Sequence, residues 1–231
     1  MDDNVPVKFT ADNDSRLLLK NELSQRQAQL MRLTPASNPL DRASTQFDIA
    51  EIMLDLDEAG MREAAWGMTR ESFEIYRDHE CWEDAVHCCD VLYRCDLPAS
   101  VPALGNGIWL AVTYPIDPEL TILMLNHLVE ATPAKADGAA VAAAVAHYIA
   151  DLRLQGEKHD SVMFLTAALL GKVAERHSGV NSQDTMNLWM NRLGLLDSKI
   201  FLPRLGQVLD AIVEGQWWYD RDELRSRLPV H

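Results

Sequence analysis

Residues 117–133 read DPELTILMLNHLVEATP, and this stretch carries the clearest helix boundaries in the chain. Asp117 offers a side chain that caps a helix, Pro118 suits the first helical position, and Glu119 places an acid in the first turn. A proline at the other end disfavours the helical conformation of the residue before it, so the helix is expected to end at Thr132. The stretch therefore predicts one complete helix.

Similar boundary signals divide the rest of the chain into helices. Before residue 117, the expected helices cover about residues 15–34, 44–60, 61–78, 81–97 and 100–114. After it, they cover about residues 137–156, 160–177, 182–194, 198–215 and 220–228. Ser15, Ser44 (or Thr45) and Asp160 are expected to cap three of them. The sequence thus predicts an all-α fold of about ten helices, and its short loops favour antiparallel hairpins.

The domain organisation follows from polarity and length. Residues 1–14 are polar and include four aspartates, so we expect a flexible acidic N-terminal arm. The remaining residues, 15–231, are enough to bury a sizeable core and are expected to form a single all-helical domain. The loop near residues 133–137 is where this domain would subdivide.

An alanine-rich segment is expected at the centre of the fold. Six alanines lie between residues 139 and 146, and their small side chains let other helices approach closely. We therefore expect this helix to pack against several neighbours.

The helices also pair at a regular spacing. Successive pairs begin near residues 61, 101, 137 and 181, a spacing of about 36 to 44 residues that is typical of helical-hairpin solenoids. The sequence therefore favours an α-solenoid or a comparable superhelical bundle.

Three residues carry a family resemblance. Tyr76, Trp82 and Ala85 have the spacing of two aromatics and a small residue, and the segment that contains them resembles a degenerate tetratricopeptide repeat. It departs from that pattern at Phe73, where a small residue is usual, and at Pro98, which comes one place late. The resemblance implies a tetratricopeptide- or HEAT-like superhelix that binds a protein or peptide on a concave face, and it implies no chemistry.

The charge balance narrows the classes of partner. The chain has 35 acidic and 21 basic side chains, a net charge of −14. A field of this sign repels phosphate backbones and anionic lipids, so we expect no nucleic-acid partner and no membrane partner. A basic protein or peptide fits better. The alternative is that the acidity only keeps the protein soluble.

The compartment is inferred from two segments. The start of the chain is acidic and polar, where a secretory signal needs a basic start and an apolar run. The small-apolar segment at residues 139–150 is too short to cross a bilayer. We expect a cytoplasmic protein.

An acidic cluster is the first candidate binding surface. Six acids surround one predicted helix–helix turn: Glu71, Glu74, Asp78, Glu80, Glu83 and Asp84. Arg70 and Arg77 are the only nearby counter-charges in the sequence, so a cationic partner would supply the rest.

The aromatic triplet Trp217-Trp218-Tyr219 is the second candidate. Three successive aromatic residues cannot all face one core, and exposed tryptophan is a common interface anchor. The alternative is that the segment folds back as a lid on the C-terminal hairpin.

The cysteines do not have metal-ligand spacing. Cys81, Cys88 and Cys95 are spaced by seven residues, which places successive thiols about 10 Å apart along a helix. We expect three buried thiols that act as small hydrophobic side chains, and Cys89 beside them as the more reactive thiol.

The histidines do not complete a carboxylate-bridged metal site. Asp84-x-x-His87 and His127-x-x-Glu130 each place two ligand types on one helix face. A di-iron bundle requires Glu-x-x-His on two helices and carboxylates from two more, which the sequence does not provide. No phosphate-binding or hydrolase motif occurs either, so we expect no catalytic residue, no metal and no cofactor.

These features rank three classes of function. The favoured one is a non-catalytic protein-binding module, such as an adaptor, an assembly factor or a dedicated chaperone. The alternatives are an α-helical enzyme that depends on a metal or cofactor, and a structural homo-oligomer in which the tryptophan segment forms a homodimer contact.

Overall fold

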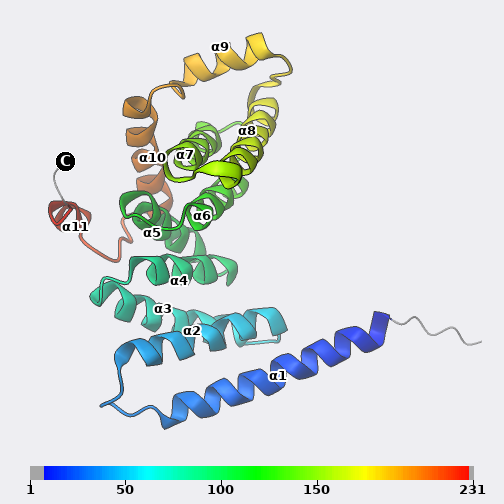
Figure 1. Ribbon diagram of the computed structural model, residues 1–231, viewed down its shortest axis with the longest axis vertical. Coiled ribbons are helices and arrows are strands. Elements are labelled where there is room, and N and C mark those ends of the chain that lie inside the picture. Colours follow the sequence, from blue (N-terminus) through cyan, green and yellow to red (C-terminus); the bar gives the residue numbers. More distant parts are fainter. Residues whose placement is uncertain (1–7, 229–231) are drawn as a thin grey trace, which may run out of the picture. The chain divides into compact units, whose positions relative to one another are not determined.

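The computed structural model describes residues 8–228, with side chains from residue 13 onward (Figure 1). This part of the chain forms eleven α-helices and contains no β-strand, so the all-α prediction is confirmed. None of these eleven helices is both long enough and apolar enough to cross a membrane. The internal contacts divide the chain into two compact units, unit 1 (residues 1–100) and unit 2 (residues 101–231).

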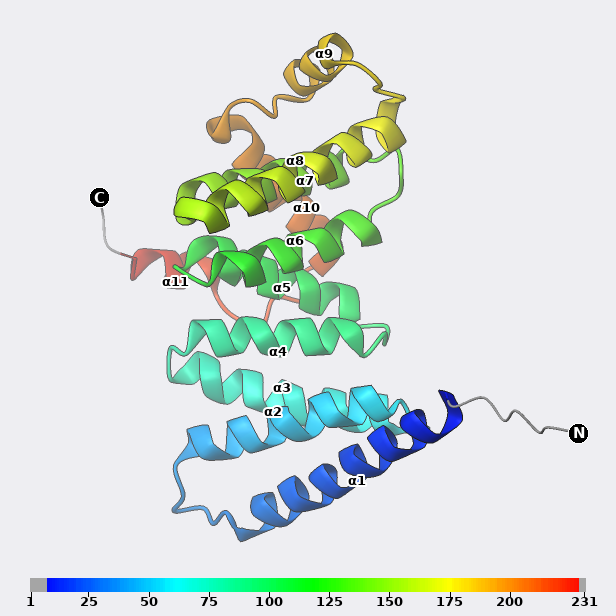
Figure 2. The same cartoon turned by 45° about the vertical axis from the view of Figure 1, so that its right-hand side comes forward.

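Unit 1 is built from four helices in sequence. They are α1 (Lys8–Arg32), α2 (Pro39–Leu56), α3 (Met61–Asp78) and α4 (Trp82–Arg94). Each helix packs against the one before it and runs in the opposite direction (Figure 2). The core gathers around α2, where Ile49, Ala50 and Leu56 are fully buried against residues of α1, α3 and α4.

Unit 2 contains the other seven helices. They are α5 (Ser100–Thr113), α6 (Pro118–Ala131), α7 (Asp137–Arg153), α8 (Gly156–Ser178), α9 (Gln183–Leu193), α10 (Ser198–Val213) and α11 (Arg221–Ser226). The alanine-rich α7 packs against α6, α8 and α10, and all six of its alanines between residues 139 and 146 are buried. Its predicted central position is therefore confirmed within this unit.

The unit boundary and the N-terminal boundary differ from the sequence predictions. The division lies after Ser100 rather than near residues 133–137, because α6 and α7 pack against each other across that loop. α1 begins at Lys8 rather than at Ser15, so half of the expected arm (1–14) is helical and residues 1–7 lie outside the described residues. No proline or glycine interrupts residues 8–14, and a helix extends readily once it has begun.

Two further helices begin earlier than predicted. α2 starts at Pro39, not at Ser44 or Thr45, because the Asn38 side chain accepts a hydrogen bond from the Leu40 N–H and so caps the helix. α8 starts four residues before Asp160. The Asp160 carboxylate accepts a hydrogen bond from His159 Nδ1 instead of capping a helix.

Candidate functional site

The predicted acidic cluster is partly neutralised within unit 1. Glu74 forms ion pairs with Arg70 and Arg77, and Arg77 also pairs with Asp78 at 2.7 Å. Glu71 accepts a hydrogen bond at 2.6 Å from a buried glutamine of α2. The two arginines therefore give Glu74 and Asp78 counter-charges within unit 1, and binding of a cationic partner to the rest of the cluster stays a prediction.

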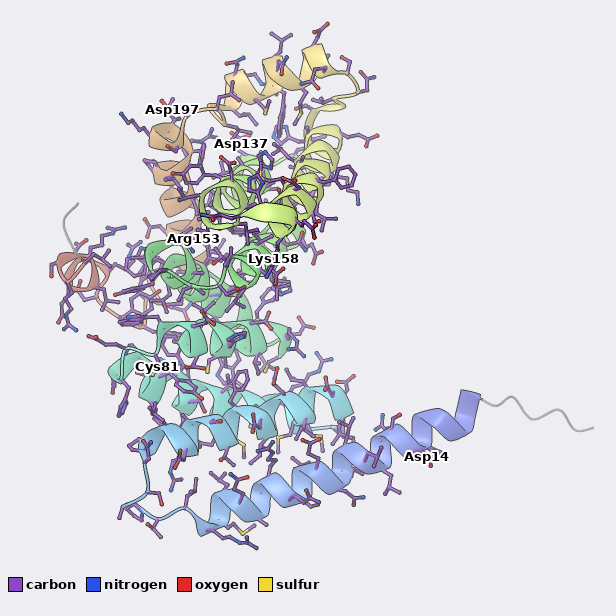
Figure 3. All side chains as sticks on the ribbon, viewed as in Figure 1. Asp14, Cys81, Asp137, Arg153, Lys158 and Asp197 are labelled. Carbon is purple, nitrogen blue, oxygen red and sulfur yellow. The ribbon has the colours of Figure 1, made fainter. Side chains whose placement is uncertain are left out.

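The other half of the cluster lies on the α3–α4 connection, which Cys81 marks in Figure 3. Glu80 has a left-handed backbone (φ 57°) in the tight turn, and Glu83 is exposed in the first turn of α4. Asp84 differs from both, because it lines a cavity together with residues of α2 and α3. The six acids therefore do not form one site.

A small cavity of about 210 Å³ lies over α3 in unit 1. It is lined by Phe47 and Glu51 of α2, Tyr76 of α3, and Asp84 and His87 of α4. α3 packs extensively against both α2 and α4, whereas α2 and α4 touch each other only slightly. The cavity therefore occupies the space that α3 holds open between its two neighbours, and we call it the acidic cavity.

The negative charge of the Glu51 carboxylate is only partly balanced by positive charge near this cavity. Burial raises the pKa of Glu51, and the carboxylates of Asp48 and Asp55 raise it further. Arg94 opposes this effect, but its Nη1 lies 3.8 Å from the Glu51 carboxylate. The same guanidinium is shared with Asp90 at 3.4 Å. One cation therefore serves several carboxylates, and the cavity has an excess of negative charge.

Aromatic rings form the rest of the cavity wall. Phe47 and His87 meet edge to face, with ring centroids 6.4 Å apart. Burial raises the pKa of Tyr76 strongly, so its hydroxyl stays protonated, and it hydrogen-bonds the Ser44 side chain. Aromatic faces beside carboxylates attract a lysine ammonium or an arginine guanidinium. The volume is below the ~300 Å³ at which ligand pockets usually begin, so the cavity suits a single side chain.

Sequence reasoning found part of this site. The prediction that Asp84 and His87 share one helix face is confirmed, since both line the cavity. It missed Phe47 and Glu51, although their spacing of four residues placed both on one face of α2.

The cysteines behave partly as predicted. Cys88 and Cys95 are buried, but Cys81 is partly exposed and so is not one of three buried thiols. The expectation for Cys89 was wrong, because this thiol is fully buried and burial raises its pKa far above the ordinary value. Burial raises the pKa of Cys95 to about 11. Within residues 13–228, no three histidine, cysteine or acidic side chains gather as a metal site.

The aromatic triplet folds back on α5 of unit 2. The buried side chain of Asn106 accepts a hydrogen bond from the Trp218 N–H at 3.0 Å, and the Tyr219 hydroxyl donates to the Asn106 carbonyl at 2.5 Å. Tyr219 also stacks on Trp109 with centroids 5.3 Å apart, and the Arg221 guanidinium lies 3.9 Å from the Trp217 ring centroid. The fold-back arrangement is therefore present, although its base is α5 rather than a C-terminal hairpin. Partner binding by these partly exposed rings stays a prediction.

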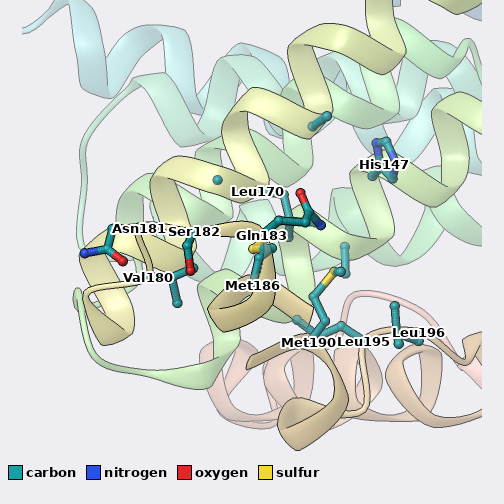
Figure 4. A pocket seen from close by; sticks show the side chains of 13 residues that line it. His147, Leu170, Val180, Asn181, Ser182, Gln183, Met186, Met190, Leu195 and Leu196 are labelled. Atoms are coloured by element: carbon teal, nitrogen blue, oxygen red, sulfur yellow. The ribbon is translucent and has the colours of Figure 1, made fainter. Parts of the chain in front are cut away.

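A larger groove of about 620 Å³ lies between α7, α8 and α9 of unit 2 (Figure 4). Its apolar walls include Leu170, Met186, Met190, Leu195 and Leu196, and three polar residues, Asn181, Ser182 and Gln183, also line it. His147 contributes the one imidazole of the lining. We call this space the α9 groove, and sequence reasoning did not identify it.

No protein-family model, no curated protein and no solved structure matches this chain. The resemblance of Tyr76, Trp82 and Ala85 to a tetratricopeptide repeat therefore stays a prediction, although Tyr76 and Ala85 are buried as that pattern requires.

Proposed function

We propose that this protein is a non-catalytic binding module that recognises a basic segment of a protein partner through the acidic cavity. The observation that carries the proposal is the convergence of Glu51 and Asp84 with two aromatic rings in a space of one side chain. Adaptor, assembly-factor and chaperone roles are all compatible with such a site. These roles differ in which protein is bound, not in the kind of contact that binds it.

The distribution of charge supports a cationic partner for unit 1. Residues 1–100 carry 20 acidic and 10 basic side chains, a net charge of −10. Residues 101–231 carry 15 and 11, a net charge of −4. A basic segment is therefore attracted to unit 1 at long range, and such steering mainly raises the rate of association.

Short-range contacts would then hold one basic side chain. An entering guanidinium or ammonium meets the half-buried Glu51 carboxylate, whose counter-charge on Arg94 lies 3.8 Å away. Charge-assisted hydrogen bonds to the half-buried Glu51 and the exposed Asp84 would then hold the cation. The faces of Phe47 and Tyr76 add cation–π attraction of about 0.5–1 kcal/mol at a site that stays partly open to water.

The proposal is tested with a pair of peptides that differ only in charge. The first is a capped pentapeptide of four alanines around a central arginine, and the second has citrulline, a neutral isostere, at that position. Amide chemical shifts in ¹⁵N-labelled protein report where each peptide binds. We expect saturable shifts at Phe47, Glu51 and Tyr76 with the arginine peptide, and none with the citrulline peptide.

Matched variants separate the cavity from the overall charge. Glu51→Gln/Asp84→Asn should weaken binding of the arginine peptide by roughly fivefold to thirtyfold, the equivalent of about 1–2 kcal/mol. Asp14→Asn/Glu22→Gln removes the same charge from exposed positions of α1 and should change the affinity by less than about twofold. Equal effects of the two double variants, or equal binding of both peptides, would show that the proposal is wrong.

A further inference from the structure

The α9 groove has the dimensions of a small-molecule site. Its volume of about 620 Å³ lies within the ~300–1,000 Å³ usual for ligand pockets, whereas the acidic cavity is smaller than that range. Its lining is mostly apolar, with a few polar groups at defined positions. Met186 and Met190 on α9 are unbranched and adapt to the shape of an apolar ligand.

A chain of hydrogen bonds links the three helices around the groove. The buried Trp189 of α9 donates from Nε1 to His177 Nδ1 at 3.2 Å. Since an indole nitrogen only donates, His177 accepts at Nδ1, carries its proton on Nε2 and donates it to Asp137 Oδ1 at 3.1 Å. This series joins α9 to α8 and α7. It holds α9, which otherwise contacts α8 only slightly, as one wall of the groove.

The tautomer of His147 follows from its neighbour. The Thr166 hydroxyl lies 2.9 Å from the carbonyl of Val162 and 3.2 Å from that of Met163, in the preceding turn of α8, and we assign its one proton to these backbone carbonyls, as is usual for a threonine inside a helix. The same hydroxyl oxygen lies 2.9 Å from His147 Nδ1, so it accepts and Nδ1 carries the proton. In the neutral ring Nε2 is then an acceptor, and no group in residues 13–228 donates to it.

The environment keeps this ring neutral. Burial lowers the pKa of His147, and the attraction of Asp151 opposes that effect only in part. The nearby Asp151 carboxylate accepts a hydrogen bond from His159 Nε2 at 3.2 Å. The groove therefore contains an uncharged imidazole acceptor beside its apolar side chains, and Asn181, Ser182 and Gln183 are its other polar residues.

We propose that the α9 groove binds a small apolar molecule that carries one hydrogen-bond donor, and that His147 Nε2 accepts this hydrogen bond. A charged ligand would lose its hydration without gaining a counter-ion, because no residue of the lining carries a formal charge at neutral pH. A ligand without a donor would leave Nε2 unsatisfied. This site is independent of the basic-partner site in unit 1, since the two ligand classes and the two sets of residues differ.

Indole and benzofuran are suitable probes, because they are nearly isosteric and only indole has an N–H donor. We expect indole to shift amides of Leu170, Met186 and Met190 and to bind roughly twofold to tenfold more tightly than benzofuran, the contribution of one neutral hydrogen bond. His147→Phe keeps an aromatic ring without nitrogens and should remove the preference for indole.

A measurement on the unaltered protein tests the same assignment without a variant that could misfold. Long-range ¹H–¹⁵N correlation should show His147 protonated at Nδ1 with a free Nε2, and the Nε2 resonance should move when indole is added. Equal affinities of the two probes, a proton on Nε2 in the free protein, a preference that survives His147→Phe, or the absence of binding in the groove would each overturn the proposal.

Discussion

Replacement of Arg153 by methionine should destabilise unit 2, because one guanidinium serves four acceptors. Arg153, at the end of α7 (labelled in Figure 3), donates from Nη1 to the carbonyls of Ala111 at 2.9 Å and Ile116 at 3.3 Å and to the Thr121 hydroxyl at 3.4 Å. Its Nη2 donates to the Val112 carbonyl at 3.1 Å. The Arg153 side chain, which belongs to α7, thus caps carbonyl groups at the C-terminal end of α5.

The size of the effect follows from the groups that would lose their partner. A buried polar group left unsatisfied costs about 1–3 kcal/mol, and a cation at a helix C-terminus contributes up to about 2 kcal/mol when partly buried. The cost of burying the guanidinium, which also lowers the pKa of Arg153, offsets part of this gain. We expect a net loss of about 2–3 kcal/mol for Arg153→Met, or about 4–12 °C in Tm for a chain of this size.

The assay is thermal unfolding followed by far-ultraviolet circular dichroism, with urea unfolding as a second measurement. Lys172→Met removes the same charge from an exposed position of α8 and should stay within about 0.5 kcal/mol of the unaltered protein. Arg153→Lys keeps the positive charge but lacks the planar set of N–H donors. Its Tm should therefore lie between those of Arg153→Met and Lys172→Met. A Tm for Arg153→Met equal to that of the Lys172 control would refute the role assigned to these four hydrogen bonds.

Two further predictions test the electrostatics and burial of unit 1. Protonation of Glu51 removes the charge that a cation needs. Because the pKa of Glu51 is raised above the ordinary value of 4.5, binding of the arginine peptide should weaken as the pH falls toward 4.5, and tighter binding at the lower pH would contradict the site. Titration with a disulfide reagent should modify Cys81 in the native protein and all four cysteines after unfolding. Fast native reaction at Cys89 would disprove its burial.

The helix boundaries show how well local sequence signals predict where a helix begins. Asp117 caps α6 as predicted, since its carboxylate accepts from the N–H groups of Glu119 and Leu120 at 2.9 and 3.0 Å. Asn38-Pro39 is the same kind of signal, a capping side chain followed by proline, but the expected helix was begun at Ser44 or Thr45 and the start of α2 was missed. The information was present in the sequence, and a consistent use of the N-cap rule would have found both helices.

The charges were a harder problem, because counting them does not reveal which are paired. The pairs of Glu74 with Arg70 and Arg77 follow the i,i+4 and i,i+3 spacing of one helix, so local rules could have removed them from the acidic cluster. No rule of sequence spacing predicts that Glu51 and Asp84 line the same cavity. This arrangement depends on how α3 separates α2 from α4, which is a property of packing between helices.

The two candidate sites differ in the charge that their polar groups require. At Glu51 a half-buried carboxylate shares one arginine, 3.8 Å away, with other acids, so the group it would gain from is a cation. At His147 the neighbouring Thr166 fixes a neutral tautomer, so the missing group is an uncharged donor. A guanidinium in the α9 groove would lose its water without an anion to replace it, and indole in the acidic cavity would leave both carboxylates uncompensated. Each probe should therefore perturb only its own set of amides, and the two proposals can fail separately.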